Sequence, residues 1–189
     1  LYRGYKPVLW STVEKTALAD AEVEYMDHKS DTIYAAFNIK KSKNEKLLNS
    51  EVIIWTTTPW TIPANRALAY NENLKYVIIK IEDQTDFKDK KIIVAQDLLK
   101  SLINDCGIEK FSKILTFPGK DFKGTICSHP FSKIGFDYDI PMLDANFVTL
   151  EQGSGIVHCA PSHGPDDFNL CLNHEIKAIE TVDGDGKYT

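Results

Sequence analysis

Three consecutive hydroxyl side chains, Thr56-Thr57-Thr58, close a β-branched segment of the sequence. Residues 51–58 predict a strand, and Pro59 ends it because proline has no N–H to donate to a ladder. Hydroxyls and free backbone N–H groups at a strand end suit the binding of a polar ligand. The threonines could equally be simple strand formers, with Asn65 as a turn residue beyond them. A polar binding site at this strand end is one of two interpretations.

A histidine, a Pro/Gly loop and two carboxylates follow one another later in the chain. Residues 154–159 predict a strand carrying His158, and the next proline after the loop suits the start of a helix with Asp166 and Asp167 in its first turn. On one interpretation, His158 belongs to the core and the aspartates complement the helix dipole, at about 0.3 to 1 kcal/mol each. On the other, the imidazole and one carboxylate reach one cleft, where the carboxylate holds a cation such as an amino group. The second aspartate would then face solvent.

Other chemistries of these residue types fit the spacing poorly. Cys159 directly follows His158, and because successive strand residues face opposite sides, the pair cannot form a thiol-protease site. His158, His163 and Asp167 could ligate a metal, but H-x4-H across a Pro/Gly loop is not an established ligand spacing, so no metal site is expected. The four cysteines include no C-x-x-C pair, which favours the reduced thiols of a cytoplasmic protein.

The composition is that of an ordinary soluble globular protein, with 189 residues, 43% apolar residues and a net charge of −5. Its longest apolar runs are strand-sized, so no membrane association is expected. The acidic balance argues against a firm grip on a long nucleic acid, although the chain could act on one end that other domains hold. The chain begins without a leader and stops in mid-element, so we expect a piece of a longer protein that acts as a monomer.

The predicted elements indicate a β-rich, barrel-like domain with helices on its outside. Residues 1–30 are expected to form a ribbon leading into the domain, which covers 31–180, and 181–189 form an exit segment. Two helices are predicted, one over 95–106 and closed by glycine, the other after Gly164-Pro165. Strands are predicted over 30–39, 51–58, 74–82, 91–94, 113–117, 124–128, 147–150 and 154–159.

Taken together, two long motifs resemble the editing domain inserted into isoleucyl-tRNA synthetase, a class I enzyme with valyl and leucyl relatives. The first is WTTTPWTIPANRAL at 55–68, and the second is GSGIVHCAPSHGPDDF at 153–168. Residues 127–131 and 144–149 resemble stretches that the family has between them in the same order. The proline-tryptophan and P-A-N-R of the first motif are similar to the isoleucyl branch. The resemblance covers nearly the whole chain and favours the functional interpretation of both motifs.

The resemblance implies hydrolysis of misacylated Val-tRNA(Ile) without a cofactor, and rejection of isoleucine by pocket size. Asp167 would bind the α-ammonium of valine, and Thr58 and His158 would line the side-chain pocket. The partners would be the valine-carrying acceptor end of tRNA(Ile) and the rest of the synthetase. Further residues are expected to position the terminal adenosine, the attacking water or other parts of the substrate: Thr56, Thr57, Trp60, Thr61, Asn65 and His163.

Several alternatives stay open beside this hypothesis: an editing domain of the valyl or leucyl type, a binding module without catalysis, or a metal-dependent hydrolase. His158 is a possible base, but the vicinal ribose hydroxyl could serve instead. Ser154, Cys159 and Ser162 stand where many members have Thr, Thr and Gly. The H-I-G-H and K-M-S-K-S signatures of the synthetic site are absent, so no amino-acid activation is expected. Lys40-Lys41-Ser42-Lys43 is only faintly similar to the latter and is interpreted as a solvated hairpin tip.

Overall fold

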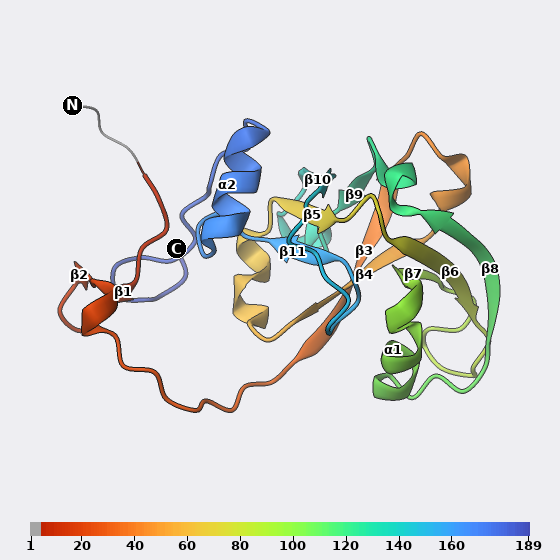
Figure 1. Ribbon diagram of the computed structural model, residues 1–189, viewed down its shortest axis with the longest axis horizontal. Coiled ribbons are helices and arrows are strands. Elements are labelled where there is room, and N and C mark those ends of the chain that lie inside the picture. Colours follow the sequence, from red (N-terminus) through yellow and green to blue (C-terminus); the bar gives the residue numbers. More distant parts are fainter. Residues whose placement is uncertain (1–4) are drawn as a thin grey trace.

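A nine-stranded mixed sheet dominates the computed structural model, which describes residues 5–189 (Figure 1). The strand order is β11-β5-β10-β9-β3-β4-β7-β6-β8, in which the β5/β10 and β4/β7 pairs are parallel and the others antiparallel. The strands of this sheet are β3 (Ile33–Lys41), β4 (Glu51–Thr56), β5 (Ala67–Tyr70), β6 (Lys75–Ile81), β7 (Lys91–Ala95), β8 (Phe111–Pro118), β9 (Ile126–Ser128), β10 (Asp139–Asp144) and β11 (Val157–Cys159).

Two α-helices and several 3-10 turns accompany these strands. The first predicted helix begins as a 3-10 turn, continues as α1 and ends before Gly107, whose φ of +63° is the left-handed stop that its sequence position suggests. The second begins at Pro165, as predicted. The helices are α1 (Leu99–Asp105) and α2 (Pro165–Asn173), with 3-10 turns η1 (Asp20–Glu22), η2 (Glu45–Leu47), η3 (Pro59–Ala64), η4 (Gln96–Leu98), η5 (Gly119–Phe122) and η6 (Ser132–Ile134).

The β-rich class is confirmed, but the barrel-like closure is not. Within residues 5–189 the sheet is open, because its edge strands β11 and β8 do not pair with each other. The sheet instead curls until β11 packs against β4, which brings the two predicted motifs together. None of the helices in this described part has the length and apolarity needed to cross a membrane.

Most predicted strands are confirmed to within a few residues, and the misses lie around β5 and β10. The predicted strand at 147–150 is wrong, because only Val148 of that stretch is buried and the chain turns there. Of the strand predicted at 154–159, only 157–159 pairs. The sequence prediction missed β5 and β10, which pair with each other in parallel.

β-branched side chains build the core of the sheet. Val52 and Ile54 of β4, Val77 of β6 and Ile93 of β7 are all fully buried. Burying each such side chain contributes about 1.5 to 3 kcal/mol, which makes β4 a firm support for the threonines at its end.

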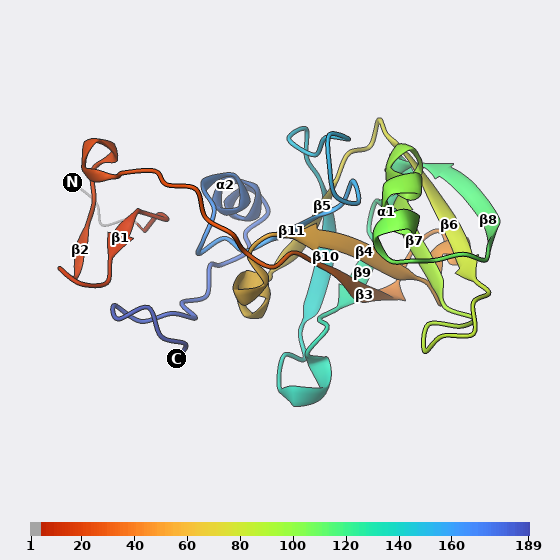
Figure 2. The ribbon, with the colours of Figure 1, turned by 90° about the horizontal axis from the view of Figure 1, so that it is seen from below.

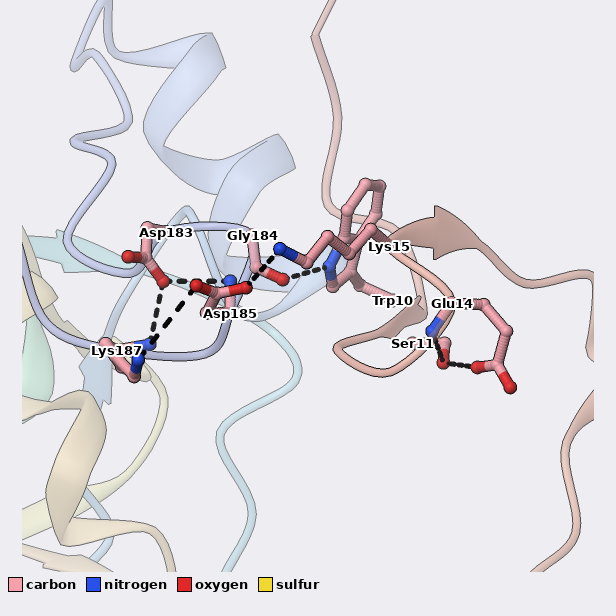
Figure 3. A network of polar contacts seen from close by, with 8 residues as sticks. All are labelled: Trp10, Ser11, Glu14, Lys15, Asp183, Gly184, Asp185 and Lys187. Carbon is pink, nitrogen blue, oxygen red and sulfur yellow. Dashed lines mark hydrogen bonds and ion pairs between the residues drawn. The ribbon is translucent and has the colours of Figure 1, made fainter.

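Residues 10–17, near the start of the chain, lie beside residues 183–187, near its end (Figure 2). Strands β1 (Trp10–Ser11) and β2 (Thr16–Ala17) form a small antiparallel ribbon within the predicted leading segment. The Trp10 indole N–H donates to the Gly184 carbonyl over 3.0 Å, and Lys15 pairs with Asp185 at 2.7 Å (Figure 3). Residues 1–4 of that segment lie outside the described residues, and the domain boundaries at 30 and 180 stay a prediction.

Candidate functional site

The end of β4, the turn before β11 and the start of α2 enclose a cavity of about 410 Å³. Eight of the nine site residues predicted from the sequence line it, and they come from both motifs although 84 residues lie between the motifs. The eight are Thr56, Thr57, Thr58, Trp60, Thr61, His158, His163 and Asp167.

The threonine run forms one wall of the cavity. Thr56 is the last residue of β4, and its buried Oγ1 accepts the backbone N–H of Thr58 over 3.0 Å. The Thr56 and Thr58 hydroxyl oxygens lie 3.3 Å apart; Thr57 and Thr58 are both exposed, whereas Thr56 is buried. Pro59 then starts η3, and the strand predicted to run to residue 58 ends at Thr56, two residues earlier.

A chain of hydrogen bonds fixes the His158 ring in the back wall. The Thr61 hydroxyl donates to the Thr58 carbonyl over 2.9 Å, and a hydroxyl has only one proton to give. The 2.8 Å contact between Thr61 Oγ1 and His158 Nε2 therefore has the ring nitrogen as donor. His158 Nδ1, 3.1 Å from Asn65 Nδ2, then accepts from that amide, whose other N–H goes to the Ala67 carbonyl over 3.0 Å.

This chain defines the protonation state of His158. Burial, reinforced by His129 and His163, lowers the pKa of its imidazole to about 4, so the ring is neutral at pH 7. Nε2 carries the proton, and the lone pair of Nδ1 is occupied by Asn65. Because both ring nitrogens are hydrogen-bonded, His158 has no free lone pair to accept a proton from a water molecule. Its ring lines the cavity in a fixed orientation.

The Asp167 carboxylate also lines the cavity. Its Oδ2 accepts the backbone N–H of Ala160 over 2.8 Å, which ties α2 to the end of β11. Burial raises the pKa of Asp167; the Ala160 N–H opposes this shift and the Asp166 charge adds to it. Within residues 5–189 no lysine or arginine forms an ion pair with Asp167. Asp167 is partly buried, whereas its neighbour Asp166 is exposed. A partly buried negative charge without a cation suits an ammonium ligand.

The turn before β11 also lines the cavity, and Gly155 allows it to pack closely against β7. Gly155 has a φ of +72°, and a Cβ there would lie 2.3 Å from the Ala95 Cβ. The turn is held by the Tyr76 hydroxyl, which donates to the Gly155 carbonyl over 2.9 Å, and by the Ala95 N–H, which donates to the Ser154 carbonyl over 2.8 Å. Gly155 therefore serves close packing.

Known proteins similar to this chain fall into one family. The profile of the tRNA synthetases class I (I, L, M and V) matches residues 1–157. The chain belongs to this family. It is 74% identical over 189 residues to an isoleucine–tRNA ligase of Pelagibacter ubique (strain HTCC1062), covering all of this chain and 21% of that protein. It is 46% identical over 194 residues to an isoleucine–tRNA ligase of Gluconobacter oxydans (strain 621H), again covering the whole chain and 20% of the relative.

Among solved structures, this class I synthetase chain shares its fold with editing domains. The crystal structure of GlLeuRS-CP1 has a TM-score of 0.55 at 19% identity, covering 75% of this chain and 60% of that one. The P. knowlesi cytosolic leucyl-tRNA synthetase editing domain has a TM-score of 0.56 at 15% identity, covering 72% and 59%. The chain spans about a fifth of the length of the isoleucine–tRNA ligases that it matches.

Asn65 lies elsewhere in this synthetase chain than the sequence suggested. Its side chain is 0% exposed and is not among those lining the cavity. Its contact is with His158, which makes Asn65 a positioning residue. Phe147, Thr149 and Gln152 line the cavity but were not expected as site residues, because nothing in their local pattern indicated that their turn faces the hydroxyls.

The rim of the cavity is aromatic. Trp60 is 53% exposed and meets the His163 ring edge-on, with 5.3 Å between ring centroids. His163 Nε2 also lies 3.3 Å from the Thr181 hydroxyl, so the terminal segment touches the rim. Across residues 5–189, no three side chains of His, Cys, Asp or Glu are grouped closely enough to hold a metal ion.

Proposed function

We propose that this class I synthetase chain hydrolyses valine from misacylated Val-tRNA(Ile) in the cytoplasm, as the editing part of a longer isoleucyl enzyme. The observation that carries the proposal is the convergence of the Thr56–Thr58 hydroxyls and the Asp167 carboxylate on one cavity. The rest of the synthetase chain and the acceptor end of tRNA(Ile) are the partners of this site. The fold shared with leucyl editing domains supports an editing role.

Asp167 binds the α-ammonium of the esterified valine. The carboxylate has no cation of its own, and an ion pair with the substrate would offset the cost of its burial. Only a free amino group satisfies this contact, so the site distinguishes an aminoacyl ester from other esters. The Ala160 N–H donates to Oδ2 of the same carboxylate and thereby fixes the orientation of the Asp167 side chain.

Thr58 and the fixed ring of His158 exclude isoleucine by overlap. One methylene in an apolar pocket is worth about 1 to 3 kcal/mol, a magnitude established on isoleucyl synthetases themselves, so a synthetic site for isoleucine sometimes accepts valine. A hydrolytic pocket with a rigid wall rejects the larger side chain instead. Thr61 and Asn65 supply that rigidity through their hydrogen bonds to His158.

Hydrolysis itself needs orientation more than a protein base. An aminoacyl ester is already activated, and hydroxyls and backbone N–H groups can stabilise the developing oxyanion. Thr56 and Thr57 orient the attacking water and the terminal adenosine, with Trp60 and His163 at the rim against the substrate. Because both His158 nitrogens are occupied, the vicinal ribose hydroxyl assists the water.

Deacylation of two esters of the same tRNA tests the proposal. The chain is expected to release valine from Val-tRNA(Ile) at least tenfold faster than isoleucine from Ile-tRNA(Ile), in line with the discrimination that one methylene provides. Release is measured with and without a chelator, and it should be unchanged by chelation. Binding of tRNA without release of either amino acid would favour a non-catalytic module and contradict the proposal.

A further inference from the structure

Six lysines gather at the far end of the β3/β4 hairpin from the threonine hydroxyls. The loop at residues 40–46 carries four of them and the turn at 119–125 carries two, against one Glu and one Asp. The net charge of these two segments is +4, in a chain whose total is −5. The six are Lys40, Lys41, Lys43, Lys46, Lys120 and Lys123.

Hydrogen bonds join the two segments into one surface. The Ser42 and Thr125 hydroxyl oxygens lie 2.8 Å apart, and Asn44 Nδ2 donates to Asp121 Oδ2 over 3.2 Å. Lys43 lies along Gly124, because a Cβ built on that glycine would be 3.2 Å from Lys43 Cε. The surface is thus ordered before any partner arrives, and Asn44 already holds the Asp121 carboxylate.

Five of these ammonium groups have no counter-ion among the described residues. Lys40 pairs with Asp139 at 2.7 Å, whereas the other five are exposed and form no ion pair with any residue in the range 5–189. The apolar side chains Leu47 and Phe122 of this region are fully buried. We call the five free lysines the lysine face: Lys41, Lys43, Lys46, Lys120 and Lys123.

We propose that the lysine face binds the phosphate backbone of the tRNA acceptor arm. Free cations without exposed apolar side chains between them fit a phosphodiester chain better than a protein interface, whose centre is apolar. Such contacts position a nucleic acid without reading its sequence. This inference rests on the proposed function, which supplies the tRNA, and it gives the K-K-S-K segment a role beyond that of a solvated hairpin tip.

The register of β3 sets the distance from the ester. Ile33 pairs with Thr56 at the cavity end of β3, and Lys41 is eight residues further along. At about 3.3 Å per residue the lysine face lies about 26 Å from the threonines. It is too far to touch the terminal adenosine, so it holds phosphates closer to the body of the tRNA while the ester occupies the cavity.

Salt-dependent binding tests the lysine face against a matched control. One variant of this chain combines K41Q, K43Q, K46Q, K120Q and K123Q; the control combines K29Q, K100Q, K110Q, K133Q and K177Q, which are exposed lysines without an ion pair elsewhere in residues 5–189. Both variants carry the same net charge. The Kd for tRNA(Ile) is measured between 50 and 200 mM salt, where each phosphate contact adds about 0.7 to 0.9 to the slope of log K against log salt.

The lysine-face variant is expected to lose about 3.5 to 4.5 from the magnitude of this slope, and the control to stay within about 1 of the unmodified chain. Hydrolysis of valyl-adenosine, which has no tRNA body, should be the same in all three proteins. Equal slopes in the two variants, or no tRNA binding by the unmodified chain at low salt, would overturn the inference. If the slope falls as expected but neither valyl ester is hydrolysed, the lysine face stands and the editing proposal fails.

Discussion

Replacing Asp167 with alanine is expected to lower kcat/KM for valine release by about 30- to 4,000-fold. Truncating one partner of a desolvated charge pair costs about 2 to 5 kcal/mol, and each 1.4 kcal/mol is a factor of ten. The loss arises because the α-ammonium of valine would have no carboxylate to meet in the cavity. The measurement is the rate of valine release from Val-tRNA(Ile) by the unmodified and variant chains.

Two further variants separate charge from structure at this position. Asp167→Asn keeps a carbonyl oxygen that can accept the Ala160 N–H, so it should preserve the thermal midpoint while losing most of the activity. Asp166→Ala removes the exposed neighbour and should change the rate by less than about threefold. Unchanged release by Asp167→Ala, or equal losses at both positions, would show that the carboxylate has no part in binding the substrate.

The free energy of unfolding is expected to fall as the pH drops from 6.5 to about 4, the range between the ordinary and the folded-state pKa of His158. The folded-state pKa of about 4 lies below the ordinary value of 6.5, so the unfolded state binds the proton first as the pH falls. The contribution of the neutral ring is complete above pH 6.5 and is lost progressively down to about pH 4. One pKa unit corresponds to about 1.36 kcal/mol, so the change amounts to roughly 3 kcal/mol.

Denaturant unfolding at pH 7, 6, 5 and 4.5 measures this loss. His158→Gln has no titrating group, so its unfolding free energy should depend less steeply on pH than that of the unmodified chain. Nitrogen NMR of the unmodified chain provides a second readout and should find Nε2 protonated and Nδ1 bare at pH 5. A doubly protonated ring at pH 5.5 would contradict the hydrogen-bond chain.

The sequence predicts elements best where β-branched residues are dense. Residues 75–81 and 91–95 are rich in isoleucine and valine and form strands close to their predicted bounds. Three of the four residues of Ala67–Tyr70 are alanine or leucine, which have no strong strand preference, and the segment pairs because β10 and β11 flank it. The proline at 141 likewise argued against a strand at 139–144, although it sits where β10 leaves its pairing with β9.

In the candidate site, too, features within one segment could be predicted from the sequence, whereas contacts between distant segments could not. Both motifs could be found in the sequence because their polar side chains stand next to prolines: the threonines precede Pro59 and the aspartates follow Pro165. The hydrogen bonds of Thr61 and Asn65 to His158 could not, since they join residues more than 90 positions apart. The open sheet was missed for the same reason, because the order of strands depends on pairings that no local pattern encodes.

A crystal of the chain soaked with a non-hydrolysable amide mimic of valyl-adenosine tests the shared cavity most directly. We expect the α-ammonium at about 2.7 to 2.9 Å from an Asp167 carboxylate oxygen, with the valine side chain between Thr58 and His158. An isoleucyl mimic should not occupy the same position. A valyl mimic bound elsewhere, or bound in the cavity without touching Asp167, would contradict the account.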